Sequence, residues 1–388
     1  MGLLLRYSFG NLVTRRLTTS LTVLGMGLVV FVFAAVLMLA HGLDKTLVAT
    51  GGEANAIVTR DGATSETVSI MGREQAGIVA TQGEVALQAD GMPVAAKEIV
   101  VLISADKRKN GDAANIVIRG TSTSAFSLRP DVKLVSGRMF TPGTSEVVAG
   151  RAVARNFRGC GLDENLRFAG REWQVVGIYD AGGSGFDSEM WGDAEQVQQA
   201  FRRPIFSSVT ARLREPARFD ELKRRLESDP RMTVEVQRER EYYGKQSKAS
   251  GTFIRVIGLA VTVLFSLGAV IGAMVTMFAA VQNRTVEIGT LRALGFSRGA
   301  VLRVFLVESL LLGLLGGLVG VAGASLLSLV NVSTMNWDTF SEVAFGFALS
   351  PSIAISALVF AVLMGMTGGL VPAVQAAGAN IIDSLRKA

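Results

Sequence analysis

A short charged segment between two long apolar runs holds the side chains best suited to specific chemistry. It extends from Arg284 to Glu308 and mixes arginines with two glutamates and three glycines. Arginine and carboxylate groups form charge-assisted hydrogen bonds with each other or with a partner. A polar segment this short, placed between two membrane spans, lies at one membrane face and cannot fold as a domain. The pattern therefore indicates mechanical coupling to a soluble partner.

The sequence offers few of the side chains that commonly serve in catalysis. His41 and Cys160 are the single histidine and the single cysteine. We therefore expect no Cys/His metal site, no Ser-His or Cys-His catalysis and no intrachain disulfide. His41 is interpreted as an interfacial polar residue at the outer end of a span, and Cys160 as a small packed residue. The chain is not expected to be an enzyme.

A nucleotide-binding motif is also missing. No G-x-x-x-x-G-K-[ST] loop occurs, and the segment Gly289 to Gly295 lacks the lysine that would reach a phosphate. We expect no cofactor in this chain, so ATP and Mg²⁺, if they drive it, are bound by another chain. The apolar runs carry no central charge of the kind that a proton- or ion-coupled carrier needs.

Four charge-free runs predict four membrane helices. They extend from Leu17 to Ala40, Val256 to Asn283, Ser309 to Trp337 and Val343 to Ile382. Each exceeds the roughly 20 residues that cross a hydrocarbon core about 30 Å thick. A cleavable signal peptide is the alternative for the first run. That run is too long for a typical signal sequence and ends in an indifferent cleavage site, which favours a retained helix.

Positive charge beside the runs predicts their orientation. The basic residues are Arg6, Arg15 and Arg16, then Arg284, Arg292, Arg298 and Arg303, and finally Arg386 and Lys387. The connection that carries Asp338 and Glu342 has no Lys or Arg. The positive-inside rule places both termini and the Arg284 segment in the cytoplasm and the stretch Asp44 to Gly251 outside. The net charge of +6 is modest, and the sequence contains no stripe of basic residues interleaved with aromatic residues. Nucleic-acid binding is therefore not expected.

The external stretch has the pattern of an α+β domain. Short β-branched runs predict strands, and other stretches predict helices. The strands are expected at 98–104, 115–119, 145–149, 166–169 and 172–179, with a hairpin at Gly170-Arg171, and the helices at 152–157, 194–201 and 219–226. The charged stretch 236–252 is either a solvated stalk helix that continues into the second span or a plain linker. We favour the stalk, because a stiff connection carries movement.

The predicted fold is therefore a polytopic α-helical membrane protein with four transmembrane helices in a 1+3 arrangement. A large α+β extracytoplasmic domain is inserted between helices 1 and 2. The expected parts are a cytoplasmic N-terminus (1–16), helix 1 (17–43), the domain (44–235), the stalk (236–252), helix 2 (253–283), the coupling segment (284–298), helix 3 (299–332), a short periplasmic loop (333–345), helix 4 (346–376) and a cytoplasmic C-terminus (377–388).

Glycine pairs within the spans predict close helix packing. Small residues four apart let helix backbones approach where no hydrophobic driving force exists. The expected packing positions are Gly268, Gly272, Gly313, Gly316, Gly317, Gly320, Gly365 and Gly369.

Several motifs together resemble one family. The run Glu287-Ile-Gly-x-Leu-Arg-Ala-Leu-Gly295, followed by Phe305-Leu-x-Glu308 and a glycine-rich span, is similar to the permeases of the MacB, LolC/LolE and FtsX group of ABC transporters. The external runs at 136–140, 145–150 and 173–178 resemble the MacB-like periplasmic core domain. The resemblance implies two permease chains, identical or related, each resting on an ATPase subunit. ATP-driven closure would then move the external domains without a substrate path through the membrane.

The resemblance assigns roles by position. The residues that fall on the coupling motif and are expected to meet the ATPase are Arg284, Glu287, Ile288, Gly289, Leu291, Arg292, Leu294 and Gly295. Ser297 is the expected N-cap of the third span. Glu308 matches an acidic position and is expected to hold the segment by pairing with a nearby arginine. For each arginine, a simple positive-inside anchor is the alternative.

The resemblance also has departures. MacB carries a fused N-terminal ATPase, whereas this sequence begins almost directly with a span, so a separate ATPase subunit is expected. FtsX-like regulators have a much smaller external domain. No residue decides between a MacB-like exporter and a LolC/LolE-like lipoprotein extractor, nor identifies a substrate, an adaptor or a lipoprotein carrier.

Three functions follow as hypotheses. The first is the membrane subunit of an ATP-driven exporter or extractor that acts on a periplasmic or lipid-anchored substrate in the bacterial inner membrane. The second is a non-transporting regulator of a cell-wall enzyme. The third, a static anchor, leaves the cytoplasmic motif unexplained.

Overall fold

The computed structural model describes residues 16–380, and the contacts divide the chain into two compact units. The membrane unit contains the described residues up to Gly42, Thr252–Val330 and those from Phe347 onward. The extracytoplasmic domain contains Leu43–Gly251 and Asn331–Gly346. Most of the expected cytoplasmic termini, with Arg6, Arg15, Arg386 and Lys387, lies outside the described residues.

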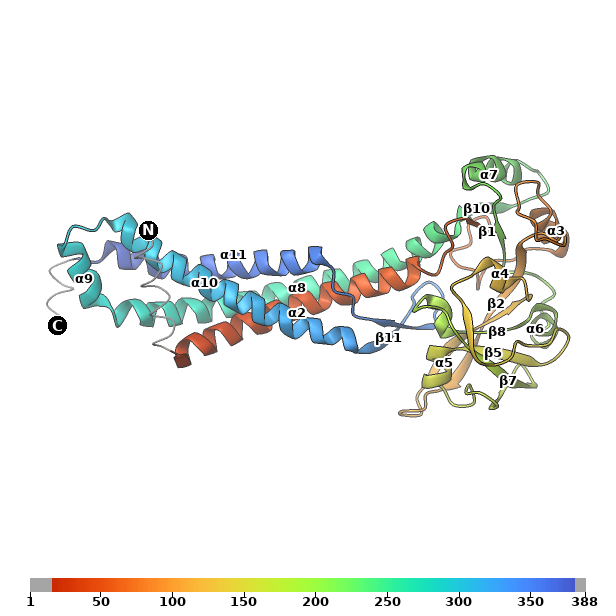
Figure 1. The fold of residues 1–388 in the computed structure, drawn as a ribbon, viewed down its shortest axis with the longest axis horizontal. Coiled ribbons are helices and arrows are strands. Elements are labelled where there is room, and N and C mark those ends of the chain that lie inside the picture. The colour runs from red at the N-terminus through yellow and green to blue at the C-terminus, as the bar shows by residue number, and fades with distance from the viewer. Residues whose placement is uncertain (1–15, 381–388) are drawn as a thin grey trace. The chain divides into compact units, whose positions relative to one another are not determined.

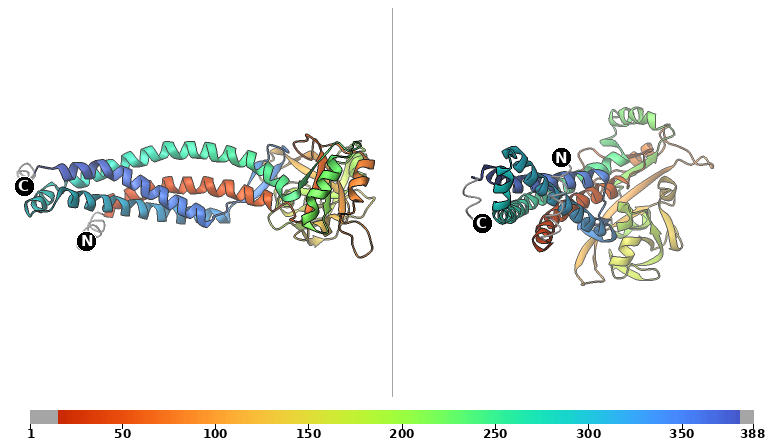
Figure 2. Two further views of the ribbon diagram at one scale, coloured as in Figure 1. Left: turned by 90° about the horizontal axis from the view of Figure 1, so that it is seen from above. Right: turned by 60° about the vertical axis from the view of Figure 1, so that its left-hand side comes forward.

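Long apolar helices build the membrane unit (Figure 1). They are α2 (Arg16–Val48), α8 (Glu239–Gln282), α10 (Arg298–Ser325) with its 3₁₀ extension η3 (Leu326–Leu329), and α11 (Pro351–Gly378). These four are long and apolar enough to cross a membrane. Ser350 caps α11 by accepting a hydrogen bond from Ile353 N, and Pro351 provides the favoured first residue. Figure 2 shows the membrane-unit parts of the helices running side by side.

Small residues bring α10 into backbone contact with its neighbours. A Cβ atom on Gly313 would lie 2.6 Å from Ala361 O, and Gly365 is similarly close to Ser309 O. Against α2, a Cβ on Gly320 would lie 2.6 Å from Gly27 O. Gly316, Gly317 and Gly369 are equally tight. The interface therefore excludes side chains at these positions.

Gly268 and Gly272 make no close helix contact within the described chain, so packing at these two positions stays a prediction. Both lie on the exposed face of α8, and no described atom of another element is within 4 Å of a Cβ at either position. A four-residue spacing specifies a smooth helix face but does not say whether that face meets a helix of the same chain. On α8, the close contact is made instead by Gly258, against Val36.

A ten-stranded mixed sheet forms the centre of the domain, in the order β10-β1-β9-β2-β3-β8-β5-β7-β4, with β6 paired to β7. The pairs β3/β8 and β5/β7 are parallel, and the other pairs are antiparallel. The strands are β1 (Asn55–Arg60), β2 (Ala95–Asp106), β3 (Ala113–Thr121), β4 (Lys133–Gly137), β5 (Glu146–Gly150), β6 (Asn165–Phe168), β7 (Arg171–Asp180), β8 (Glu189–Asp193), β9 (Ser208–Arg212) and β10 (Val234–Arg238).

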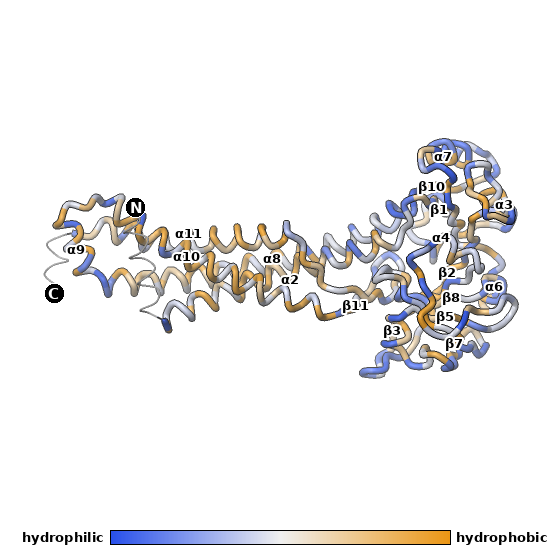
Figure 3. The backbone as a smooth tube through the Cα atoms, in the orientation of Figure 1, coloured by the Kyte–Doolittle hydropathy of each residue, from blue (hydrophilic) through white to orange (hydrophobic). Residues whose placement is uncertain are grey.

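Two apolar cores cover the two faces of this sheet. Side chains alternate along each strand, so Val147 and Ala149 lie in one core and Val148 in the other. Figure 3 shows the mixture of apolar and polar residues in the domain, in contrast to the long apolar stretches of α10 and α11. The helical elements are α3 (Arg73–Ala80), α4 (Ala125–Leu128), α5 (Arg151–Asn156), η1 (Gly185–Ser188), α6 (Ala194–Ala200), η2 (Pro216–Arg218) and α7 (Phe219–Glu227).

The stretch 236–252 differs from a solvated stalk. Its first residues, to Arg238, form the edge strand β10, and the helix α8 then continues from Glu239 without interruption to Gln282. The helical alternative is thus correct. Tyr242, Tyr243 and Gln246 are buried, so this part of the helix packs into the domain instead of standing in solvent.

The connection between spans three and four is a second correction. The expected loop 333–345 is an antiparallel hairpin of β11 (Asn331–Met335) and β12 (Glu342–Gly346), which belongs to the domain. The third span therefore ends before residue 332, and the fourth helix begins at Pro351 and not at residue 346. The sequence Glu-Val-Ala-Phe-Gly alternates in burial, as a strand does.

Smaller differences concern the turn between β6 and β7. The hairpin is present, but Ala169 and Gly170 make the turn, with φ values of 49° and 73°, and Arg171 already belongs to β7. Glycine supplies the positive φ at one of these positions without a steric cost.

Candidate functional site

The coupling segment folds as a short helix, α9 (Thr285–Ala293), followed by a turn into α10. Gly295 adopts φ 94°, which ends the helix, and the Ser297 side chain accepts a hydrogen bond from Ala300 N as the N-cap of α10. Local sequence thus specifies helix, turn and helix.

A buried ion pair fastens α9 to α10. Arg284 Nη1 lies 2.9 Å from Glu308 Oε2, and each side chain is only 6% exposed. The pairing expected for Glu308 is therefore present. A buried pair is costly to break, because the remaining charge has no partner.

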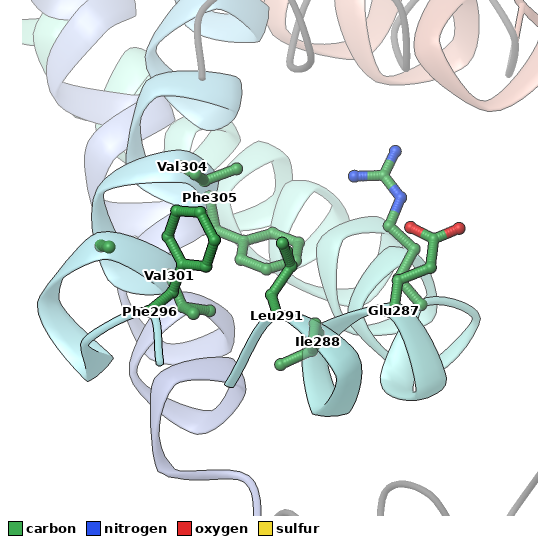
Figure 4. Close-up of a pocket in the computed structure, with 9 residues that line it drawn as sticks. Glu287, Ile288, Leu291, Phe296, Val301, Val304 and Phe305 are labelled. Atoms are coloured by element: carbon green, nitrogen blue, oxygen red, sulfur yellow. The ribbon is translucent and has the colours of Figure 1, made fainter. Parts of the chain in front are cut away.

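An apolar pocket lies beneath α9. Ile288 and Leu291 face Val301, Val304 and Phe305 of α10, as Figure 4 shows. Ile288, Val301 and Phe305 are buried. Phe296 also lines this pocket from the turn. Apolar contact therefore joins the ion pair in making α9 and the start of α10 one body.

The structure separates the expected coupling residues into three groups. Arg284, Ile288 and Gly289 are buried and face the bundle, so they support α9 and do not present a surface to a partner. The exposed residues are Glu287, Leu294 and Gly295, and Leu291 and Arg292 are half-buried. Leu294 is the most notable, with 72% of its surface accessible. Its exposure at the turn gives the segment an apolar contact point.

A buried charge cluster in the domain was not anticipated. Arg119 makes paired hydrogen bonds to Glu189 (2.7 and 2.9 Å) and to Glu66 (2.8 and 3.0 Å). Arg129 makes a pair to Glu98 (2.7 and 2.8 Å). These ions are almost fully buried. The available signal was a charge inside an apolar strand, at Glu98 and Arg119, which in a buried strand requires a partner.

Electrostatics in this cluster keep Glu98 and Arg119 charged. Burial alone would raise the pKa of Glu98, but Arg129 and Arg119 outweigh it and lower that pKa to about 2. Burial would likewise lower the pKa of Arg119, and the carboxylates of Glu189 and Glu66 hold it well above its ordinary value. The cluster is therefore an ionic core within the domain.

Glu239, the first residue of α8, links this cluster to the end of α2. Its Oε2 accepts hydrogen bonds from Gly52 N and Asn55 Nδ2, both at 2.8 Å, and its Oε1 lies 3.4 Å from Arg129. The backbone of Gly51 packs directly on Glu239 and Arg240, which leaves no room for a side chain at Gly51. The outer ends of α2 and α8 are thus held together within the domain.

The two residues that could react are placed differently. Cys160 is fully buried, and burial raises its thiol pKa to about 12, so it packs and does not react. His41 lies half-buried near the outer end of the apolar part of α2. Among residues 16–380, no group of three or more His, Cys, Asp or Glu side chains could hold a metal ion.

Comparison with known proteins identifies both parts of the chain. Residues 19–229 match the MacB-like periplasmic core domain, and residues 259–381 match the FtsX-like permease C-terminal model. The domain match covers more than half of the sequence.

Individual relatives agree with these matches. The chain is 27% identical over 278 residues to the uncharacterized ABC transporter permease YknZ of Bacillus subtilis, covering 66% of each chain. It is 38% identical over 117 residues to the macrolide export ATP-binding/permease protein MacB of Neisseria gonorrhoeae, covering 30% of this chain and 17% of that protein.

A solved structure aligns with the domain only loosely. The periplasmic region of MacB from Actinobacillus actinomycetemcomitans aligns at 15% identity and a TM-score of 0.36, covering 49% of this chain and 91% of that one. Taking the two model matches together, the chain belongs to the ABC transporter permeases that combine a MacB-like periplasmic core domain with an FtsX-like permease domain.

Proposed function

We propose that this chain is the membrane subunit of an ATP-driven transporter that converts ATP hydrolysis by a separate ATPase subunit into movement of its periplasmic domain. The movement drives export or extraction of a periplasmic or lipid-anchored substrate. The MacB relatives, named for macrolide export, support the export class.

The observation that carries this proposal is the construction of α9. The Arg284–Glu308 pair and the contact of Ile288 with Phe305 fix α9 to α10, while Leu294 and Glu287 are exposed. One face of α9 is thus fixed to α10 and the other is exposed. This arrangement suits the transfer of a displacement from a soluble partner into a membrane helix. ATP and Mg²⁺ belong to that partner.

Pairing with a second permease chain fits the exposure of α8. Only 11% of the most apolar stretch of α8 is buried within the described chain. Phe265 and Ile271 lie on this open surface with Gly268 and Gly272. Lipid and a second chain, either identical or related, would share this face.

Reconstitution tests the function. The chain would be purified from its native membrane, and the ATPase that accompanies it would be identified by its phosphate-binding loop and then prepared separately. We expect Leu294→Asp to weaken the association about five- to thirtyfold, since an exposed apolar contact at an interface centre typically contributes ~1–2 kcal/mol. Binding would be measured by fluorescence titration in nanodiscs.

Leu162→Asp is the matched control. Leu162 is also an exposed leucine, at 37%, but it lies in the extracytoplasmic domain. Its replacement should leave ATPase binding unchanged. Absence of any associated ATPase, or equal binding by both variants, would overturn the proposal. Coupled hydrolysis without any transported molecule, but with a hydrolase bound to the domain, would favour the regulator hypothesis instead.

A further inference from the structure

The β11–β12 hairpin connects two membrane helices, yet it is built into the extracytoplasmic domain. Its strands pair in register from Asn331↔Gly346 to Met335↔Glu342. Val343 and Phe345 are buried, at 5% and 4% exposed. The hairpin therefore has a packed face and is not a free loop.

Polar contacts attach the hairpin to the large sheet. Glu342 Oε2 lies 2.6 Å from Lys107 Nζ, just after β2, in a pair whose side chains are 10% and 30% exposed. On the same strand, Ala344 N donates a hydrogen bond of 2.9 Å to Ser188 Oγ. A partly buried pair of this kind holds its position better than a surface pair.

The tip of the hairpin is held at two further points. Asn115 Nδ2 donates a 3.1 Å hydrogen bond to Phe340 O, and Asn336 Nδ2 lies 3.4 Å from Gln246 Oε1 on α8. Phe340 has φ 56°, a left-handed conformation that costs a bulky residue ~1–2 kcal/mol. Such a conformation persists where surrounding contacts fix it. The domain contacts thus determine the shape of the tip.

The connectors to the membrane helices are short. Only Val330 separates η3 from β11, and residues 347–350 separate β12 from α11. Because each step along an extended chain covers at most about 3.6 Å, the flanking elements lie no more than ~7 Å and ~18 Å apart. Displacement of the end of α10 by more than a few ångströms must move the hairpin or detach it.

We propose that the β11–β12 hairpin is a mechanical link that carries displacement of α10 into the extracytoplasmic domain, in addition to α2 and α8. This inference rests on the proposed function. The link begins at the coupling segment, because α10 is fixed there to α9 by Arg284 and Glu308. From Glu308 it continues along α10 to Ser325, about 26 Å, and then through η3 to the hairpin.

The test uses the full chain in nanodiscs with its ATPase and follows hydrogen–deuterium exchange in α9, in the hairpin and in residues 107–121. Exchange would be compared without nucleotide and after trapping with ATP and vanadate. For the unaltered chain, we expect trapping to change exchange in all three regions. In Lys107→Glu or Glu342→Lys, hairpin amides should exchange at least about tenfold faster. The nucleotide-dependent change should remain in α9 but become smaller in residues 107–121, because only α2 and α8 then carry the displacement.

Charge exchange provides the matched variant. Lys107→Glu combined with Glu342→Lys restores opposite charges and should restore the response of residues 107–121. Arg73→Glu, which breaks the exposed pair with Glu195 elsewhere in the domain, should leave it intact. Should a charge variant fail to fold, Ser188→Ala combined with Asn115→Ala removes two other hairpin contacts and is expected to give the same reduction.

The outcomes separate the two proposals. If the ATPase does not bind, or α9 in the unaltered chain does not respond to trapping, the proposed function fails. If α9 responds and residues 107–121 respond to the same extent after the hairpin has detached, the function stands and the hairpin link is wrong.

Discussion

At the residue scale, buried ion pairs do the same work in both units. Glu98 pairs with Arg129 inside the domain, and Glu308 pairs with Arg284 in the membrane unit. Neither pair is evidence of high stability by itself, because desolvation offsets much of the attraction. Their value lies in fixing one arrangement of the elements that carry them. Loss of one partner should therefore be costly at both places.

Glu98 makes the free energy of unfolding of the domain depend on pH in the acid range. Its pKa is lowered to about 2 from an ordinary value of 4.5. A carboxyl with a lower pKa in the folded state adds stability above the unfolded pKa, and this is lost as the pH falls towards the folded pKa. We expect the free energy of unfolding to decrease between about pH 4.5 and pH 2. Urea titrations followed by fluorescence of buried Trp173 and Trp191 would measure it.

Glu98→Gln should lower the unfolding free energy at pH 7 by about 3–5 kcal/mol, because two arginines lose a buried partner. It should also reduce the acid dependence. The control is Glu215→Gln at an exposed pair with Arg218, expected to cost at most about 1 kcal/mol. Equal effects at the two sites would contradict the ionic-core interpretation.

The Arg284–Glu308 pair leads to a second residue-scale prediction. Arg284→Gln or Glu308→Gln leaves one buried charge alone, so α9 should open more often. We expect trypsin to cut at Arg292 or Arg298 about tenfold faster, which corresponds to ~1.4 kcal/mol in the opening equilibrium. Reversal of both charges, Arg284→Glu with Glu308→Arg, should recover much of the protection. Unchanged cleavage in both single variants would show that the pair does not hold α9.

At the element scale, helix contacts depend on where a glycine faces. Gly313 meets the backbone of Ala361, whereas Gly272 meets no described atom of another element. A larger residue at Gly313 must push α11 away, but the same change at Gly272 only adds a methyl group to an open face.

Matched alanine substitutions test this difference. Gly313→Ala should lower the stability of the membrane unit by about 1–3 kcal/mol through overpacking. Gly272→Ala should be neutral or stabilising by up to about 1 kcal/mol, the gain in helix propensity. Thermal unfolding in detergent would be monitored by circular dichroism. If Gly272→Ala instead dissociates a dimer at constant monomer stability, its face is the pairing surface.

Elements with strong hydrophobic periodicity could be predicted from the sequence, whereas elements defined by contacts between distant residues could not. The apolar helices and the β2, β3 and β7 strands are in the expected places, because composition and alternation specify them locally. The ion cluster unites Glu66, Glu98 and Glu189, whose proximity depends on sheet order. The hairpin at 331–346 could not be predicted from the sequence, because its apolar residues continue the apolar runs of the neighbouring spans. At α9, the sequence located the segment but not which residues face inward.

At the scale of the whole molecule, the chain is a multi-pass membrane protein whose large domain is a MacB-like periplasmic core. The positive-inside pattern predicts that α9 and the domain lie on opposite sides of the membrane, with both termini in the cytoplasm.

Cysteine labelling tests this orientation. Leu294→Cys should react with a membrane-impermeant maleimide only in inside-out vesicles, and Val68→Cys only in right-side-out vesicles. Both positions are exposed, at 72% and 57%, and the buried Cys160 should contribute no background. Labelling of the two cysteines from the same side would disprove the topology and, with it, the placement of an ATPase at α9.

The uninterrupted helix α8 restricts where residues can be inserted into or deleted from this protein. Within the membrane unit, its residues from Thr252 to Gln282 fix the angular phase between the side chains at the two ends of this stretch. One inserted residue would rotate everything beyond it by about 100°, whereas seven, close to two full turns, would return it nearly to alignment. Surface loops of the domain carry no such constraint. Length variation should therefore accumulate in the loops, while α8 tolerates only insertions that preserve its winding.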